Sequence, residues 1–287
     1  MSFKKVDLSF QSCKSEYNDA DVVIYSCPMD ATTSYRPGTR FAGNAIRVDS
    51  FGIEWYSPHR DMNLKDFQTC DIGDLDLPIG AVEDALDIIY DTTKQILKDN
   101  KKPMMIGGEH LVTYPVVKAV AEKYPDLHMI HLDAHTDLRD EFFGRKLSHA
   151  TVLRRCFDVL GPGRIYQFGI RSGDKHEFDW AASGNTFLRK FDFEGLAEAI
   201  QKIKDKPVYI TIDLDVLDPG VFPGTGTPEP GGMQYKDLLK AFDLFENLNN
   251  IVGADFVELN PYLDPSGAST AVACKTLREM VLILHRK

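Results

Sequence analysis

The sequence predicts an α/β protein of three layers, in which a mostly parallel sheet lies between two layers of helices. From residue 79 onward, short runs of Ile, Leu, Val and Met alternate with amphipathic segments of helix length, which is typical of parallel strands joined by helices. The chain has 287 residues, enough for one large domain to bury roughly three quarters of the surface of the unfolded chain. We therefore expect a single domain over residues 1–287.

Each expected element follows from its own pattern. In the helix expected at residues 81–98, apolar residues recur at spacings of three and four, and Asp99 and Asn100 follow it. Strands are expected at residues 21–26, 104–106, 127–132, 165–169, 208–214 and 251–257. Further helices are expected near residues 114–123, 150–159, 193–204, 235–248 and 271–284. The turn-rich stretch through residues 34–40 mixes Arg, Tyr and Phe, which predicts a packed loop at a site or a subunit interface.

Composition excludes several classes of function. Lys and Arg number 33 against 43 Asp and Glu, and no basic stripe is present, so nucleic acid is not an expected partner. The five cysteines are scattered without a Cys-x-x-Cys pair, which indicates reduced thiols. Residues 1–7 have no signal-peptide core, and no apolar stretch is long enough to span a bilayer. We expect a cytoplasmic protein that does not bind a membrane.

Acidic and histidine residues follow three of the expected strands. Asp133, His135 and Asp137 occupy alternate positions, as do Asp213 and Asp215, so each set points to one side if the strand or its extended exit continues that far. Ligands of open α/β sheets bind beyond the carboxyl ends of the strands. The candidate metal ligands at these ends are His110, Asp133, His135, Asp137, Asp213 and Asp215.

Four carboxylates and two imidazoles are too many ligands for one ion. Two divalent cations would balance the four negative charges, with one or two acids bridging ions that lie ~3.5–4 Å apart. Oxygen-rich ligation without thiolate favours Mn²⁺ or Mg²⁺ over structural zinc, and we predict two manganese ions. Taken alone, Asp213 and Asp215 fit a turn before Asp218 equally well, but the two clusters together favour metal.

The motifs that contain these residues resemble those of the ureohydrolases. The matching segments are residues 107–110, 133–137, 213–215, 226–232 and 258–261, with residues 36–41 similar to those of agmatinases. The resemblance covers nearly the whole chain and implies an arginase-like fold, a dinuclear manganese site and a homo-oligomer, either a trimer or a hexamer. It assigns one ion to His110, Asp133, Asp137 and Asp213. It assigns the other to His135, Asp133, Asp213 and Asp215, so that Asp133 and Asp213 bridge.

The resemblance also implies a reaction, the hydrolysis of agmatine to putrescine and urea in polyamine biosynthesis. Two metals can supply a bridging hydroxide that attacks the guanidinium carbon, since coordination can lower the pKa of water from about 15.7 to roughly 7. The family analogy assigns protonation of the leaving amine to Asp137 and a proton shuttle at the substrate to His149. Glu258 follows the strand 251–257, where its carboxylate can bind the guanidinium through charge-assisted hydrogen bonds. We expect Asp255 to be structural and His131 to be able to orient a metal ligand.

The substrate and the class of enzyme leave alternatives open. Residues 138–147 lack the Asn and Ser pattern with which arginases bind arginine, which favours agmatine, but Arg139 or Arg145 could bind the carboxylate of guanidinobutyrate or arginine. A non-haem iron oxygenase that uses His131 and Asp133 would leave the other acids unexplained. A two-metal phosphoesterase would use the acids, but its usual Gly-Asn-His turn is absent. A non-catalytic metal-binding relative is disfavoured because every expected ligand is present.

Overall fold

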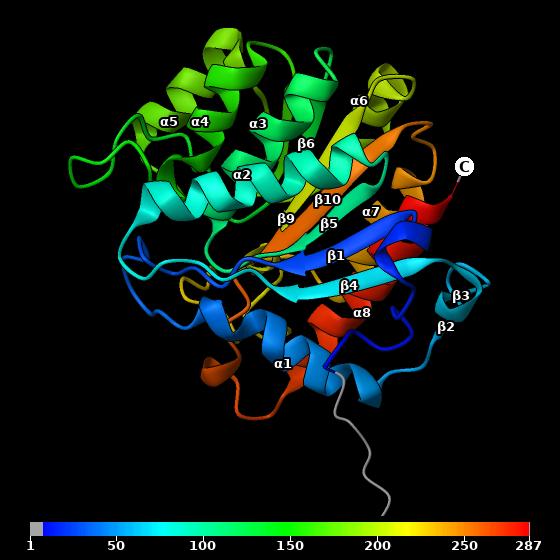
Figure 1. The fold of residues 1–287 in the computed structure, drawn as a ribbon. Helices are drawn as coiled ribbons and strands as arrows, with labels where there is room; N and C mark the ends of the chain where they lie inside the picture. The colour runs from blue at the N-terminus through cyan, green and yellow to red at the C-terminus, as the bar shows by residue number, and fades with distance from the viewer. Residues whose placement is uncertain (1–7, 287) are drawn as a thin grey trace, which may run out of the picture.

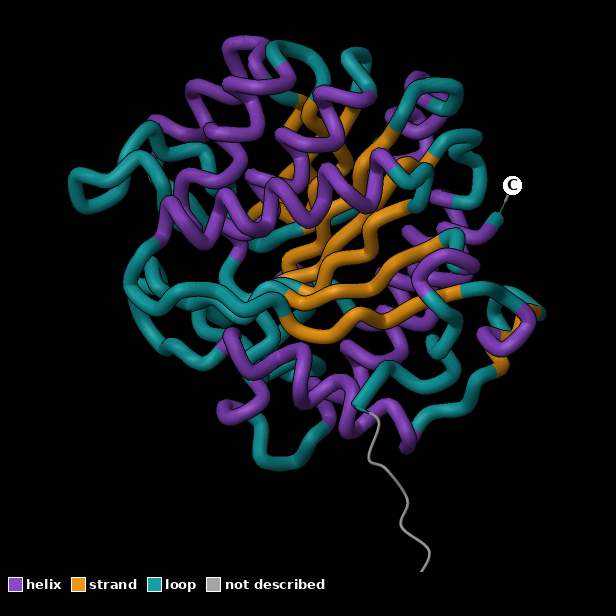
Figure 2. The backbone as a smooth tube through the Cα atoms, viewed as in Figure 1, coloured by secondary structure: helices purple, strands orange, loops and turns teal. Residues whose placement is uncertain are grey.

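The computed structural model describes residues 8–286. Within this range eight strands form one sheet in the order β4-β1-β5-β10-β9-β6-β7-β8, and all of its strand pairs are parallel. Helices cover both faces (Figure 1), and loops gather at one end of the strands (Figure 2). The expected three-layer α/β/α fold is confirmed. The expectation that residues 1–7 hold no signal peptide lies outside the described residues.

The bounds of the elements are as follows. The strands of the sheet are β1 (Val22–Ser26), β4 (Thr69–Asp74), β5 (Lys102–Ile106), β6 (His128–Leu132), β7 (Ile165–Ile170), β8 (Phe187–Lys190), β9 (Val208–Asp213) and β10 (Ile251–Val257). The α-helices are α1 (Ala42–Asp49), α2 (Val82–Lys98), α3 (Thr113–Lys123), α4 (Val152–Leu160), α5 (Lys175–Trp180), α6 (Leu196–Ile203), α7 (Tyr235–Phe245) and α8 (Ala268–His285). A small antiparallel pair consists of β2 (Tyr56–Ser57) and β3 (Met62–Asn63).

The two faces of the sheet pack into separate cores because side chains alternate along each strand. On β9, Ile210 and Ile212 pack with α6, α7, α8 and α1, whereas Tyr209 packs on the opposite face with α2, α3 and α4. Strands β1, β5, β6, β7, β9 and β10 are almost wholly buried, which explains their continuous apolar sequences. Within residues 8–286, no helix is both long and apolar enough to cross a membrane.

The elements that the sequence did not predict lie mainly at the edges of the sheet. Strands β4 and β8 are the two edge strands, and their sequences mix charged and apolar residues without the continuous apolar run of the central strands. Helix α1 was missed as well. It approaches β1 closely at Gly43, where a Cβ would lie 2.3 Å from the Ser26 hydroxyl oxygen.

The centre of the sheet brings together the strands that precede the candidate site residues. Strands β5, β10, β9 and β6 are consecutive neighbours, and their carboxyl ends open onto the same edge because they are parallel. The loop through residues 34–40 lies at this edge, although the side chain of Tyr35 in it is exposed. Arg36 there donates hydrogen bonds to the carbonyl oxygens of Gly226 and Thr225, both at 2.9 Å.

Candidate functional site

One half of the site is centred on the imidazole of His110. His110 begins the 3₁₀ turn η5 (His110–Val112) after β5. Its Nδ1 lies 3.2 Å from Oδ2 of Asp133 and 3.3 Å from Oδ2 of both Asp137 and Asp213. Three carboxylates from two strand ends therefore converge on one ring nitrogen, and all four side chains are nearly or fully buried.

The other half is centred on His135. Its Nδ1 lies 3.0 Å from Oδ2 of Asp215 and 3.5 Å from Oδ1 of Asp133. Asp213 joins this half through Oδ1, which accepts a hydrogen bond from the backbone N–H of Asp215 at 2.9 Å. All six candidate ligands thus lie in one cluster, and Asp133 contacts both halves. The ligand atoms of Asp133, His135 and Asp215 lie within 4.8 Å of one another, close enough to bind one cation.

The backbone brings these residues together in a different way from the expected extended strands. Strand β6 ends at Leu132, before the first acid, and Asp137 has a left-handed backbone with φ of 53°. Strand β9 ends at Asp213, and Asp215 lies in the 3₁₀ turn η8 (Leu214–Val216). The expectation that alternate positions of a continued strand align the side chains was wrong; tight turns beyond the strand ends aim them at one point.

The donor set fits cations. Nδ1 of His110 and Oδ2 of Asp215 are buried and make no hydrogen bond to any described residue. On the other side of the ring, Nε2 of His110 lies 3.1 Å from the hydroxyl of Thr211, which donates in turn to Asp255 at 2.6 Å. Because that hydroxyl donates its proton to Asp255, it accepts from His110, so Nε2 carries the imidazole proton and Nδ1 is free to bind metal. Asp255, which we expected to be structural only, therefore reaches the site through Thr211.

Burial opposes charge throughout the cluster. Burial and the neighbouring charge of Asp133 raise the pKa of Asp137 to about 7. Burial, together with Asp215 and Asp133, raises the pKa of Asp213 well above its ordinary value. Burial alone would lower the pKa of His110, but the three surrounding carboxylates raise it well above the ordinary value. The buried carboxylates therefore need positive charge nearby. Protons supply it in the metal-free protein, and divalent cations would also supply it.

Glu258 is tied to the same turn as His110. Its Oε1 accepts a hydrogen bond from the backbone N–H of His110 at 2.8 Å, and burial followed by the charge of Glu109 raises the pKa of Glu258 to about 8. The turn itself requires glycine because of close packing. A Cβ at Gly108 would lie 1.9 Å from the carbonyl oxygen of Met29, so close approach of two chain segments, in addition to the sharp turn, excludes a side chain.

His149 faces the site from the opposite wall. It begins the 3₁₀ turn η6 (His149–Thr151), its backbone N–H donates to the Thr32 hydroxyl at 3.0 Å, and its Nε2 lies 3.3 Å from the Ser34 hydroxyl. Burial lowers the pKa of His149 to about 4. The sequence did not point to Glu109, which holds this wall by accepting a hydrogen bond from the backbone N–H of Thr32 at 2.8 Å.

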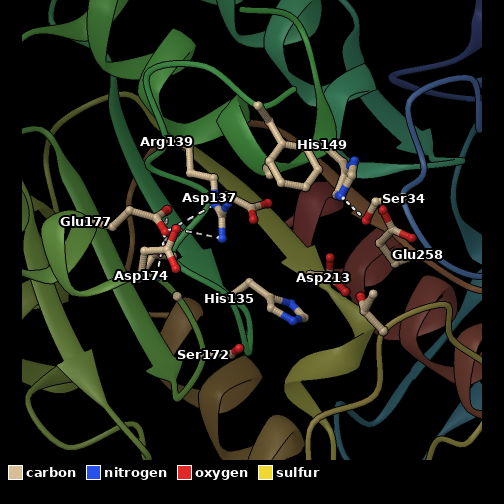
Figure 3. A pocket seen from close by; sticks show the side chains of 15 residues that line it. Ser34, His135, Asp137, Arg139, His149, Ser172, Asp174, Glu177, Asp213 and Glu258 are labelled. Atoms are coloured by element: carbon tan, nitrogen blue, oxygen red, sulfur yellow. Dashed lines mark hydrogen bonds and ion pairs between the residues drawn. The ribbon is translucent and has the colours of Figure 1, made fainter. Parts of the chain in front are cut away.

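A cavity of about 250 Å³ joins the cluster to these side chains. Asp137, Asp213, His135, Glu258 and His149 line it and surround the same space (Figure 3).

The mouth of the cavity carries a paired arginine. Arg139 is the one arginine or lysine among the described residues that line the cavity, and its guanidinium lies 3.0 Å from Asp174 and 3.5 Å from Glu177. Arg145 lines a neighbouring cavity instead. Arg139, the candidate cation for a substrate carboxylate, is therefore neutralised within the chain.

Comparisons with known proteins identify relatives over almost the whole chain. The model of the Arginase family matches residues 20–283. An agmatinase of Bacillus anthracis is 48% identical over 93% of this chain and 92% of its own length. A human mitochondrial guanidino acid hydrolase is 32% identical over 93% of this chain and 79% of its own length. The crystal structure of the agmatine ureohydrolase of Thermoplasma volcanium superposes with a TM-score of 0.89 at 32% identity, covering 98% of this chain and 95% of that one.

Proposed function

The chain belongs to the Arginase family and is a ureohydrolase, and we propose that it hydrolyses agmatine to putrescine and urea. The observation that carries this proposal is that Glu258 and the His–Asp cluster line one cavity. A carboxylate there can hold a guanidinium while the cluster activates water beside it. The reaction adds one water, whose oxygen bonds to the guanidinium carbon, while the C–N bond to the alkyl amine breaks and a proton passes to the leaving nitrogen.

We propose that two manganese ions bind the cluster. One would be held by His110, Asp133, Asp137 and Asp213, and the other by His135, Asp133, Asp213 and Asp215. Nδ1 of His110 and Oδ2 of Asp215, which make no hydrogen bond to a described residue, support this assignment, as does the absence of thiolate from the cluster. The ions, when bound, would supply hydroxide at neutral pH and balance the charge of the carboxylates.

Glu258 and Asp137 would perform separate tasks on the substrate. The Glu258 carboxylate, held by the backbone of His110, would accept hydrogen bonds from the guanidinium and fix its carbon over the cluster. Asp137 has a pKa raised to about 7 by burial, which suits a group that takes a proton from water and returns it to the leaving amine. Such general-acid steps contribute about 10²–10⁴-fold to a rate.

His149 would move protons at the outer wall of the cavity. Burial keeps its imidazole neutral at neutral pH, with a pKa lowered to about 4, so one ring nitrogen has a lone pair available to the substrate. Its contact with Ser34 and with the Thr32 hydroxyl holds the ring toward the substrate. We assign His149 to substrate contact and proton transfer.

The charge at the mouth of the cavity supports an amine substrate over a guanidino acid. Arg139 is paired with both Asp174 and Glu177, which leaves this wall with one net negative charge. Such a wall favours the ammonium tail of agmatine and disfavours a carboxylate tail. Guanidinobutyrate or arginine is the second candidate substrate, and its carboxylate could bind Arg139 only if Arg139 leaves Asp174 and Glu177. A relative named as a guanidino acid hydrolase supports this second candidate.

A urea-release assay with added Mn²⁺ tests the substrate directly. We expect agmatine to have a far higher kcat/KM than arginine, 4-guanidinobutyrate or uncharged butylguanidine. Butylguanidine is the matched comparison because it keeps the guanidinium and loses the tail charge. Equal kcat/KM values for agmatine and 4-guanidinobutyrate would overturn the choice of agmatine.

We also propose that residues 1–287 form one ureohydrolase domain that assembles as a homo-oligomer in the cytoplasm and takes part in polyamine biosynthesis. The five unpaired cysteines support a reducing compartment. The exposed rings of Phe41 and Tyr262, 4.9 Å apart, support a subunit contact. Light scattering tests the assembly, with a trimer or hexamer as the expected result, and cell fractionation tests the location.

A further inference from the structure

His131 lies beside the metal cluster and has no place in the ligand set proposed above. It is fully buried on β6 and pairs in register with Gln167 on β7, so the two side chains leave neighbouring strands on the same face. Nε2 of His131 lies 2.7 Å from Oδ2 of Asp133, and its Nδ1 lies 3.2 Å from Nε2 of Gln167. The imidazole therefore connects a buried amide to a buried carboxylate.

Two further contacts fix which way the amide of Gln167 faces. Its Nε2 lies 2.9 Å from the carbonyl oxygen of Thr136, and its Oε1 accepts a hydrogen bond from the Thr186 hydroxyl at 3.0 Å. A carbonyl oxygen only accepts hydrogen bonds. Turning the amide over would set two carbonyl oxygens against each other, so the NH₂ group faces Thr136 and His131.

The orientation of the amide determines the tautomer of His131. One N–H of Gln167 is donated to Thr136, and the other points at Nδ1 of His131. A ring nitrogen that accepts from an N–H carries no proton of its own. The proton of the imidazole therefore lies on Nε2 and is donated to Oδ2 of Asp133.

The carboxylate of Asp133 is held at both oxygens. Oδ2 accepts from His131, and Oδ1 accepts from the backbone N–H of His135 at 2.5 Å. The same two oxygens face the two halves of the cluster, Oδ2 toward Nδ1 of His110 and Oδ1 toward Nδ1 of His135. Fixing both oxygens sets the plane of a carboxylate that contacts both halves.

We propose that Gln167 and His131 are a positioning pair, in which Gln167 sets His131 as an Nε2–H donor and His131 orients Asp133 to bridge two divalent ions. This inference rests on the metal centre proposed above. Partners that orient a metal ligand from behind typically change metal affinity by about 10–100-fold when they are removed. Both members of the pair lie on strands of the sheet, His131 on β6 and Gln167 on β7.

Calorimetric titration of the full chain with Mn²⁺, after removal of metal by a chelator, tests the pair. His131→Phe keeps a ring but no donor, and Gln167→Met keeps the volume but no amide. We expect both to bind Mn²⁺ about 10–100-fold more weakly than the unaltered chain, and His131→Gln, which retains an N–H donor, to recover most of the loss. Tyr166→Phe is the matched control, because Tyr166 is the buried neighbour of Gln167 on β7 and its hydroxyl has no hydrogen-bond partner among the described residues.

Nitrogen NMR of ¹⁵N-histidine in the metal-free protein gives a second reading that does not depend on metal binding. We expect His131 to show a protonated Nε2 and an unprotonated Nδ1, and Gln167→Glu, whose carboxylate accepts, to protonate Nδ1. A protonated Nδ1 in the unaltered chain would overturn the pair. So would unchanged Mn²⁺ affinity in both His131→Phe and Gln167→Met, with two ions still bound. An unaltered chain that binds no Mn²⁺ would instead overturn the proposed centre and the pair together.

Discussion

The carboxylate of Glu258 accepts a hydrogen bond from the backbone N–H of His110, 2.8 Å away and 148 residues earlier in the chain. The backbone N–H of Glu258 donates in return to the carbonyl oxygen of Gly108 at 2.9 Å. Glu258 also has a left-handed backbone with φ of 66°, a conformation that is uncommon outside glycine and gathers at functional sites. The proposed substrate anchor and a proposed metal ligand are therefore positioned by the same turn.

Replacement of Glu258 separates substrate binding from metal binding. Glu258→Gln keeps the size and the acceptor for the His110 N–H but loses the charge, so we expect kcat/KM for agmatine to fall by about 10²-fold or more. Metal content should stay near two ions per chain. Urea release and metal analysis measure the two effects, with Glu198→Gln on the exposed face of α6 as the control. Full activity of Glu258→Gln would exclude Glu258 as the anchor.

Replacement of His149 tests proton transfer at the outer wall. We expect His149→Asn to lower kcat for agmatine by about 10²-fold without loss of metal, because the ring of His149 faces Ser34 and the cavity and is not one of the six proposed metal ligands. Free imidazole should restore part of the rate. The exposed His176→Asn on α5 is the control. Unaltered kcat in His149→Asn would rule out the shuttle.

Removal of metal should abolish urea release, since the cluster alone provides no hydroxide at neutral pH. Treatment with a chelator followed by Mn²⁺ is expected to restore the activity as two ions bind per chain. The rate of urea release is measured as a function of the number of Mn²⁺ ions bound per chain. Activity that persists after complete removal of metal would contradict the proposed centre.

The stability of the metal-free protein should fall as the pH rises from 6.5 to 8. The pKa of Asp137 is raised to about 7 and that of Glu258 to about 8, in each case first by burial, while unfolded carboxyls ionise near about 4. A raised pKa means that the folded state holds the proton more tightly, so the stability that these groups contribute is complete below about pH 4 and is lost as the pH rises through about 7 and 8. Each group can contribute up to about 1.4 kcal/mol per pH unit within its window.

Urea denaturation at both pH values, with chelator and with Mn²⁺, measures this dependence. Burial lowers the pKa of His110, but its carboxylate neighbours outweigh burial and raise the pKa. The stability that His110 contributes is therefore also lost as the pH rises. We expect Mn²⁺ to remove most of the fall, and Glu258→Gln to reduce the slope of the metal-free protein. A metal-free protein that becomes more stable over this range would show that the acids are ionised in the fold.

The charge at the cavity mouth should control the choice between tails. Asp174→Asn removes a partner of Arg139, so we expect the ratio of kcat/KM for agmatine to that for 4-guanidinobutyrate to fall by about fivefold, the equivalent of ~1 kcal/mol for an exposed charge. Arg139→Gln should leave that ratio unchanged or raise it. Asp140→Asn, which affects an ion pair with Arg155 outside the cavity, is the control. A ratio that Asp174→Asn does not alter would remove the electrostatic basis for the preference.

The sequence predicted the central strands because they are buried on both faces and therefore uniformly apolar. It missed β4 and β8, whose edge positions tolerate Asp, Gly, Lys and Arg. The fold class depends on the central strands, so it was predicted correctly without the edges.

The candidate ligands were predicted from acids at strand ends, but the turns that aim them were not. The left-handed backbone of Asp137 depends on contacts made by the folded loop, which local spacing does not encode. Of the residues behind the ligands, His131 was anticipated and others were missed, although a signal was present. Asp255, Thr211 and Gln167 are polar residues inside otherwise apolar strands, and each is fully buried, so each needs a polar partner.

The order of the strands has a consequence for synthesis of the protein. The four central strands are neighbours in the order β5-β10-β9-β6, so β5 and β6 are separated by the two strands made last. A nascent chain that has emerged only as far as β8 holds His110, Asp133, His135 and Asp137. It lacks β9 and β10, which lie between β5 and β6 and set the distance between His110 and the residues that follow β6. High-affinity metal uptake should therefore mark a chain whose translation has passed residue 258, and a truncated chain should be recognisable by its failure to retain the ions.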